Sequence, residues 1–450
     1  MIFVRDKKFY TTLVAFALPI ALQQLITVGV NMADNIMLGQ LGEAPMSSAT
    51  QANNFITIFI IMCMGLGMGA SVLVSRFFGM NDALRMKKSV NIMYRLLFTI
   101  ATIFSIVTAL FPAQIMWLFS KEQDVIAGGV GYLLISIPCY YLNGFAVTSS
   151  IILRCVGKAN VPLFSSICSF FINIFFNWVF IFGKLGVPAM GVNGAALGTL
   201  IARVVEFTII VGFLLFKDTN VGFRLKDLTL PVGDLIPEYI RISIPVLVSD
   251  TLLGLGNSAV AVVMGHIGAS FVAANSITSV VMSLATVVIQ GISQASCSIT
   301  GITLGRGEVE KAQQQGYTFA ALGFIIGGIG CGLILALSNV IVGVYKIEPE
   351  TAVLARDLMH ALAYVIWFQA ANSILTKGTL RGGGDTKFLM VADIIFLWVC
   401  SIPLGALTGL VWKWPGFWVY IMLRIDQFIK CIICIVRLRS GKWIKKIQKV

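Results

Sequence analysis

Charged residues are scarce in this sequence. Of 450 residues, 12% are charged and 58% are hydrophobic, and the mean hydropathy is +0.90. A soluble globular domain carries about a quarter charged residues, so this composition excludes that class. No Lys, Arg or His lies between Lys8 and Arg76. The sequence therefore predicts a polytopic membrane protein built from long apolar helices.

Residues for metal, redox or phosphate chemistry are also few. The two histidines, His266 and His360, lie near the ends of predicted spans, and no GxxxxGKS or GxxxxGKT motif for nucleotides is present. The nine cysteines fall almost all within apolar runs. Only Cys431 and Cys434 form a CxxC, without a second pair or a histidine. We expect neither an enzyme nor a bound cofactor, so an ion gradient would have to supply the energy.

The basic excess, 33 Lys and Arg against 20 Asp and Glu, lies mostly in short loops between apolar segments. Because this distribution orients a membrane protein, we interpret the charge as topology and expect no nucleic-acid partner. The stretch before Leu13 lacks an apolar core and a small-residue cleavage site, so we expect no cleaved signal peptide.

Runs of about 20 apolar residues predict twelve crossings of the membrane. One set of alternate loops, including both termini, holds 25 Lys and Arg, whereas the other holds 5. By the positive-inside rule, both termini are expected in the cytoplasm of a multi-pass protein of the inner or plasma membrane. The predicted spans are 12–38, 52–75, 92–118, 126–150, 160–182, 192–215, 237–263, 276–300, 317–345, 354–376, 388–410 and 415–436.

The sequence repeats itself. At an offset of 226 residues Pro19 aligns with Pro245 and Asn31 with Asn257, and at 227 LRCVG aligns with LRGGG. Two copies of six helices share one orientation in the membrane, so we expect an all-α fold of two pseudo-symmetric six-helix bundles around a central cavity. The expected domains are residues 1–216 and residues 237–450, the latter with a basic cytoplasmic tail. A polar cytoplasmic connector at 217–236 would join them.

An acid interrupts the first apolar segment. Asp34 lies near the end of LPIALQQLITVGVNMADNIMLGQLG, where a charge at membrane depth costs about 2.5 to 3.5 kcal/mol on insertion scales. The residue aligned with it in the second copy is Val260, which favours a role confined to the first copy. We interpret Asp34 as functional. The alternative is a residue that caps its helix or bonds a neighbouring backbone group.

Polar side chains on two later segments are candidates to act with Asp34. Asn173 and Asn177 lie four residues apart on one face of an apolar helix. Thr199 lies in GVNGAALGTLIAR, whose small residues permit close helix contact. Oxygens of these four residues are hard ligands suited to Na⁺, and they would equally hold a protonated carboxyl. We predict an ion-coupling site here, while noting that Asn and Thr in membranes often only join helices.

Other intramembrane charges have simpler interpretations. Arg203 and Glu206 are three residues apart, and Asp426 and Lys430 are four apart, so each pair is expected to neutralise itself on its helix. Asp393 is expected near the membrane interface, only a few residues into its span. These five residues are therefore interpreted as structural.

A substrate cavity and two hinges complete the prediction. Asp250 has no basic partner on its own helix, so it is a candidate contact for a cationic substrate, or alternatively a satisfied core acid. Pro19 and Pro245 lie at matching depth in the first helix of each copy, where a missing amide hydrogen bond permits a kink or hinge. The residues assigned to the cavity are Gln24, Asn31, Asp250 and Asn257.

Taken together, these features resemble the multidrug and toxic compound extrusion (MATE) family over nearly the whole chain. The resemblance rests on Pro19 followed fifteen residues later by Asp34 and then LGQLG, and on two pairs of segments. These are VLVSRFFGMNDALRMKKS with SITGITLGRGEVEKAQ, and LRCVGKANVP with LRGGGDTKF. It implies a V-shaped pair of bundles that exports organic cations or amphipathic drugs in exchange for H⁺ or Na⁺.

The resemblance also implies residue roles. The first-helix acid of the family, here Asp34, is the coupling carboxylate, and the fifth- and sixth-helix polar residues match the rest of the predicted site. Many members carry Asp where this chain has Asn177. NorM-type members have acids near the positions of Leu253 and Ala370, so this chain is more similar to the DinF and MepA-like branches.

The expected cycle begins with Asp34 opened to the outside, where it takes up H⁺ or Na⁺ and the bound cation is expelled. Because a ligand shifts only an equilibrium between states that it binds differently, the ion must favour one conformation. We expect a monomer in the lipid bilayer, with small organic cations or drugs as its partners. The alternative is a flippase for a lipid-linked precursor, although Arg203 is the sole basic residue in the central spans. A non-transporting receptor would need a soluble ligand-binding domain, which we do not find.

Overall fold

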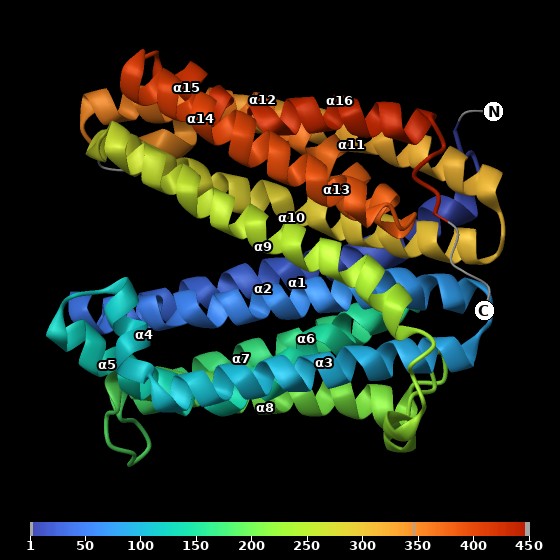
Figure 1. Cartoon of the computed structure of the whole chain (residues 1–450). Coiled ribbons are helices and arrows are strands. Elements are labelled where there is room, and N and C mark those ends of the chain that lie inside the picture. The colour runs from blue at the N-terminus through green and yellow to red at the C-terminus, as the bar shows by residue number, and fades with distance from the viewer. Residues whose placement is uncertain (1–2, 345–346, 446–450) are drawn as a thin grey trace. The chain divides into compact units, whose positions relative to one another are not determined.

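The computed structural model describes residues 3–344 and 347–445, which form helices, turns and irregular segments without a strand (Figure 1). The α-helices are α1 (Lys7–Gly39), α2 (Glu43–Gly79), α3 (Ala83–Leu110), α4 (Pro112–Phe119), α5 (Gln123–Ile135), α6 (Ile137–Cys155), α7 (Asn160–Phe182), α8 (Gly191–Gly212), α9 (Ile236–Ile267), α10 (Ala269–Gly305), α11 (Val309–Val344), α12 (Pro349–Ser373), α13 (Thr386–Asp393), α14 (Ile402–Ala406), α15 (Gly416–Leu423) and α16 (Ile425–Arg439). Four π-helical segments and one 3₁₀ segment extend or connect them, namely η1 (Phe213–Lys217), η2 (Leu225–Thr229), η3 (Ile374–Leu380), η4 (Ile394–Ser401) and η5 (Leu407–Val411), of which η2 is the 3₁₀ segment.

The predicted all-helical architecture is confirmed, and ten helical segments of the described chain are long and apolar enough to cross a membrane. The pair α5 and α6, bent by 57° at their junction, adds an eleventh. Helices α15 and α16, which meet at Arg424, occupy the last predicted span, 415–436. Several predicted spans are too short, because the helices continue past their apolar centres into polar ends.

The chain forms two compact units, one of residues 22–243 and the other of residues 1–21 with 244–450. The boundaries therefore fall inside α1 and α9 and within three residues of Pro19 and Pro245. The predicted connector, 217–236, packs within the first unit, where the Asn91 amide donates to the Asp227 backbone carbonyl at 2.9 Å.

In the unit of residues 22–243, glycines of α8 allow that helix to lie directly against α7. A methyl group added at Gly194 would lie 2.6 Å from the Phe180 carbonyl oxygen. One at Gly198 would lie 3.0 Å from the backbone nitrogen of Asn177 and would strike its side-chain amide. The predicted close contact of the small-residue segment is therefore confirmed, and it makes room for Asn177.

In the other unit, α12 continues as η3, and this continuation packs tightly against α10. A methyl group at Gly382 would lie 2.6 Å from the Cys297 carbonyl oxygen, and one at Gly378 would lie 2.8 Å from the Ser293 carbonyl oxygen. Buried apolar residues of α10, α11, α12 and α15 fill the core beside this contact. The tight contact fixes the side chains that project from η3, which include Lys377 and, just beyond its end, Arg381.

The repeat predicted from the sequence is confirmed in the backbone. Helices α2 and α10 each contain 37 residues, and both of their ends are offset by 226. Each follows a glycine with positive φ, 110° at Gly42 and 152° at Gly268. Gly157 and Gly384, 227 residues apart, have φ values of 81° and 83°. Glycine adopts this conformation at little cost, so the two copies end their helices by the same means.

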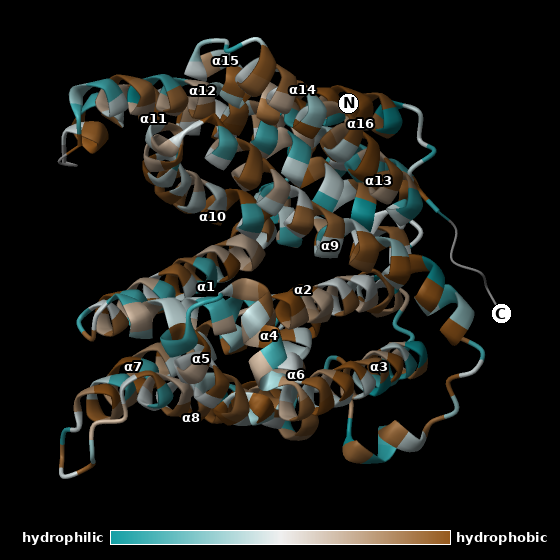
Figure 2. Ribbon diagram, turned by 60° about the vertical axis from the view of Figure 1, so that its left-hand side comes forward, coloured by the Kyte–Doolittle hydropathy of each residue, from teal (hydrophilic) through white to brown (hydrophobic). Residues whose placement is uncertain are grey.

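Hydrophobic residues occur along most of the length of the helices (Figure 2), and many of their large apolar side chains are exposed. Phe171 and Val399 are each 65% exposed and Val340 is 64% exposed. Soluble proteins rarely expose extensive apolar surface, because water disfavours it. Helices of this length and polarity instead fit a surface that faces lipid.

Candidate functional site

Asp34 lies in the last turns of α1 and is bound by α7. The Asn177 amide nitrogen donates to Asp34 Oδ1 at 2.6 Å. Asp34 is half-buried and Asn177 is fully buried, at 0% exposure. Among the described residues the Asp34 carboxylate forms no ion pair, so it is bound by an amide and not neutralised by a cation.

A chain of polar side chains continues from this contact. Asn177 Nδ2 also lies 3.2 Å from Asn173 Oδ1, and Asn173 Nδ2 lies 3.4 Å from Thr199 Oγ1 on α8. The structure thus brings together all four residues of the predicted ion-coupling site, from three helices of one unit. Asn173 and Asn177 face the same way because they are four residues apart on α7.

One oxygen of this cluster has no partner. Asn177 Oδ1 is buried without a hydrogen bond in the described part of the chain. A buried acceptor without a donor is costly, and a proton donor or a cation at this point would satisfy it. The Asn177 nitrogen faces Asp34, whereas this oxygen faces Gly198 on α8, where an added methyl carbon would strike it. The Asp34 carboxylate itself is therefore the candidate group for H⁺ or Na⁺. The described residues contain no group of three or more His, Cys, Asp or Glu that could hold a transition metal.

Arg203 is held away from Asp34 by its own acid. Its guanidinium Nη1 pairs with Glu206 Oε2 one turn further along α8. This pair was predicted; Glu206 is buried at 6% exposure, whereas Arg203 is half-buried. Arg203 also acts on Asp34 through space. It thereby contributes positive potential beside the acid without forming an ion pair with it.

The polar side chains of α1 that precede Asp34 lie in different environments. Gln23 is buried and its side-chain oxygen accepts a 2.5 Å hydrogen bond from Arg154 Nη2 of α6. Gln24 is half-buried and Asn31 is exposed. The contact between Gln23 and Arg154 was not predicted from the sequence, because the two residues are 131 positions apart.

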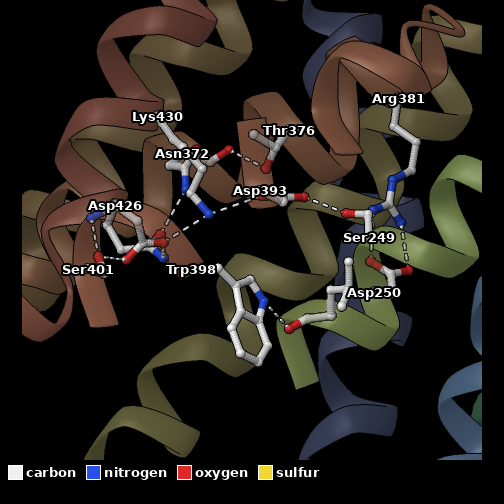
Figure 3. A network of polar contacts seen from close by, with 12 residues as sticks. Ser249, Asp250, Asn372, Thr376, Arg381, Asp393, Trp398, Ser401, Asp426 and Lys430 are labelled. Atoms are coloured by element: carbon white, nitrogen blue, oxygen red, sulfur yellow. Dashed lines mark hydrogen bonds and ion pairs between the residues drawn. The ribbon is translucent and has the colours of Figure 1, made fainter. Parts of the chain in front are cut away.

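In the other unit Asp250 has a partner that the sequence did not reveal. Arg381 binds its carboxylate with both terminal nitrogens, at 2.9 and 3.2 Å (Figure 3). This pairing argues against the prediction that Asp250 contacts a cationic substrate and supports the alternative of a satisfied acid. Asn257, also assigned to the substrate cavity, is exposed and accepts a 2.7 Å bond from Arg424. The internal repeat could have indicated this ion pair, because Arg381 aligns with Arg154. Each of these arginines contacts the first helix of its own copy, α9 and α1 respectively.

Asp393, at the end of α13, is buried within the unit at 6% exposure. Its carboxylate accepts from Lys430 at 3.0 Å and from Ser249 at 2.5 Å. Lys430 also forms the predicted pair with Asp426, at 2.9 Å. Figure 3 shows the resulting line of contacts from Ser249 through Asp393 and Lys430 to Asp426. The position of Asp393 relative to the membrane interface stays a prediction, and its interpretation as a structural residue agrees with a buried partner from α16.

The two prolines lie inside long helices, as predicted. Pro19 interrupts α1 and Pro245 interrupts α9, and both are buried. Each therefore removes one helical hydrogen bond close to a boundary between the compact units. Their role as hinges stays a prediction.

Comparison with known proteins agrees with the repeat. The sequence model of the MatE family matches residues 19–179 and again residues 245–407, so the two matches begin 226 residues apart. The probable multidrug resistance protein NorM of Thermotoga maritima is 25% identical over 444 residues, covering 96% of this chain and 93% of the relative. The probable multidrug resistance protein YoeA of Bacillus subtilis is 24% identical, covering 87% and 85%.

Solved structures agree in fold. An outward-facing multidrug resistance MATE transporter of the MOP superfamily matches with a TM-score of 0.87 at 20% identity, covering 97% of this chain and 96% of that one. The fold and the family match define a multi-pass helical membrane transporter. The chain belongs to the MatE family, the MATE transporters, which two model matches covering most of its length establish.

Proposed function

We propose that this chain is a secondary active antiporter that exports organic cations or amphipathic drugs in exchange for H⁺ or Na⁺. The observation that carries the proposal is the 2.6 Å contact between the Asn177 amide and the Asp34 carboxylate within an apolar helix. An acid kept without a cationic partner among apolar helices is costly unless it binds something, which here is the coupling ion. The relatives named as multidrug resistance proteins support the substrate class.

In the coupling step, the ion and the Asn177 amide compete for the Asp34 carboxylate within one unit. With an ion on Asp34, the carboxylate no longer needs the Asn177 donor, and the Asn177, Asn173 and Thr199 chain rearranges. The rearrangement changes the packing of α1 against α7 and lowers affinity for the bound cation. Release of the ion to the cytoplasm restores the original contacts. The ion drives export only because its affinity differs between the two conformations.

The test is efflux of a fluorescent organic cation from membrane vesicles, with proton and sodium gradients imposed separately. Asp34→Asn keeps the size of the side chain but removes its charge, so we expect at least about a tenfold loss of gradient-driven efflux, equivalent to about 1.4 kcal/mol. Asn177→Ala is expected to weaken coupling as well. Glu43→Gln removes an exposed carboxylate of the same unit and serves as the control. The proposal would be contradicted if the Asp34→Asn variant exported the cation at the wild-type rate and this efflux still stopped when the ion gradient was removed.

We further propose that the chain groups with the DinF and MepA-like branches, a proposal that rests on the family resemblance of the sequence. The resemblance implies that NorM-type members have acids near the positions of Leu253 and Ala370, and Ala370 is fully buried at 0% exposure. A second cation site of the NorM kind would need carboxylates at these positions. The flippase alternative has no support among the relatives reported above, all of which are named as multidrug resistance proteins or transporters. A monomer in the inner or plasma membrane, with both termini in the cytoplasm, completes the proposal.

A further inference from the structure

A polar cavity lies inside the unit of residues 1–21 and 244–450. It encloses about 110 Å³, enough for several waters or for one small charged group. The cavity is lined by α9, α10, α12 with η3, α13 with η4, and the region where α15 meets α16. Its charged lining consists of Lys377, Arg381, Asp393, Arg424, Asp426 and Lys430.

Two groups of these charges are already compensated. Arg381 forms the bidentate ion pair with Asp250, and that pair carries no net charge. Lys430 lies between Asp393 and Asp426, at 3.0 and 2.9 Å, so this trio carries a charge of −1. All three members of the trio are at most 6% exposed.

Two cations remain without an acid. Lys377 lies on η3, one turn before Arg381, and forms no ion pair or hydrogen bond among residues 3–344 and 347–445. Asp250 and Asp393 act on it only through space, as do Arg381 and Lys430. Arg424 donates to the neutral Asn257 amide at 2.7 Å and contacts the Tyr420 hydroxyl. With the −1 of the trio, these two cations give the cavity and its partners a charge of +1.

Unused polar atoms also face this region. The Nε atoms of Arg381 and Arg424 are buried donors without a partner in the described chain, and Arg381 is 4% exposed. The Asn372 side-chain oxygen is a buried acceptor without a donor, and Asn372 is 4% exposed. Buried donors and uncompensated cations are costly, and an anion that accepts hydrogen bonds would satisfy them.

We propose that this cavity binds a monoanionic oxygen-acid group, such as a carboxylate, with Lys377 and Arg424 as its counter-charges. One negative charge matches the +1 of the site, whereas a cation would meet net repulsion. The acceptor oxygens of Asn372 and Gln369 suit a hydroxyl or amine beside the anionic group. The site is separate from Asp34, which lies in the other unit. It deepens the proposed function by extending the ligands to carboxylate-bearing, zwitterionic compounds.

The test measures binding and not transport, so it is independent of the proposed antiport. Purified full-length protein in neutral-lipid nanodiscs is titrated calorimetrically with benzoate, and with benzamide as a neutral probe of the same shape. We expect saturable binding of benzoate and at least about tenfold weaker binding of benzamide. Lys377→Gln and Arg424→Gln should each lower the affinity for benzoate by about tenfold or more, whereas Lys377→Arg should retain the wild-type affinity.

Lys413→Gln is the matched control, because it removes an exposed cation from the same unit. Thermal unfolding of every variant separates loss of binding from loss of fold. Equal affinity for benzoate and benzamide would overturn the proposal, as would benzoate affinity unchanged in both folded Gln variants. Nanodiscs with phosphatidylglycerol distinguish the source of the anion. If phosphatidylglycerol weakens the binding of benzoate, the site binds a lipid phosphate group. If benzoate binding is unchanged, the site binds a soluble carboxylate.

Discussion

The two copies of the repeat place an arginine at equivalent residues but pair it with different chemistry. Arg154 donates to the neutral Gln23 side chain, whereas Arg381 binds the Asp250 carboxylate. The second copy therefore holds its first helix with an ion pair where the first copy uses an amide. This divergence is consistent with a coupling acid in the first copy alone, since Val260 replaces Asp34 in the second.

The trio of Asp393, Lys430 and Asp426 gives a residue-scale prediction. Lys430→Met leaves two neighbouring carboxylates buried and unpaired, so we expect the free energy of unfolding to fall by about 3 to 5 kcal/mol. Asp393→Asn leaves Lys430 paired with Asp426 and should cost less. The measurement is the thermal midpoint in detergent, with the exposed Glu310→Gln as control. A midpoint of Lys430→Met equal to the wild type would contradict this account.

The separation of contacting residues decided which could be predicted from the sequence. Asp426 and Lys430 were paired correctly because one helical turn fixes their distance. The Asp393 to Lys430 contact joins residues 37 positions apart, and the Asp250 to Arg381 contact joins residues 131 apart. Such contacts depend on how helices pack, which periodicity does not determine. Asp34 and its partners were an exception, because each is a rare polar residue in an apolar segment.

At the scale of the element, the contact of α7 with α8 depends on glycines. Gly194→Ala would place a methyl group 2.6 Å from the Phe180 carbonyl oxygen, so the helices must separate. We expect a loss of about 1 to 3 kcal/mol in unfolding free energy, as for other overpacked sites. Gly212→Ala is the control on the same helix, since an added methyl there meets nothing within 4 Å. Thermal midpoints should fall for the first variant only, and equal midpoints would refute the packing argument.

The lengths of the apolar segments predicted that the chain is helical and in which order the helices come. They did not predict the π-helical segments or the bend between helices. Hydropathy predicted one continuous segment at 354–376, whereas α12 changes to the π-helical η3 and continues to Leu380. A π-helical stretch depends on tertiary packing, which here is the contact of Gly378 with Ser293. The bend of 57° between α5 and α6 has a local cause, since Pro138 lies in the first turn of α6, but the apolar length of 126–150 predicted one continuous span.

At the scale of the whole molecule, the chain changes from one compact unit to the other next to Pro19 and Pro245. If these prolines act as hinges, replacing them restores a hydrogen bond and stiffens α1 and α9. We expect Pro19→Ala and Pro245→Ala to slow efflux several-fold while the thermal midpoint stays equal or rises. Pro349→Ala, at the exposed first turn of α12, is the control because no helical hydrogen bond is missing there. Normal efflux in both variants would exclude a hinge role.

The orientation of the chain in the membrane gives the last prediction. The set of loops that includes both termini holds 25 Lys and Arg against 5 in the other set, so both termini should lie in the cytoplasm. Alkaline phosphatase, which is active only outside the cytoplasm, can be fused after Lys184, after Lys413 or after Val450. We expect activity at the first two positions and none at the third.

The last two fusions also decide whether α15 and α16 cross as one span despite their break at Arg424. Arg424 and Lys430 are expensive in a lipid-facing helix, but here one is bound by Asn257 and the other by two acids. Both basic groups therefore have polar partners inside the unit, although only Lys430 is paired with acids, and these partners permit a crossing that hydropathy alone does not support. Fluorescent-protein fusions at the same positions should give the opposite pattern. Phosphatase activity on the same side after Lys413 and after Val450 would show that α15 and α16 do not cross.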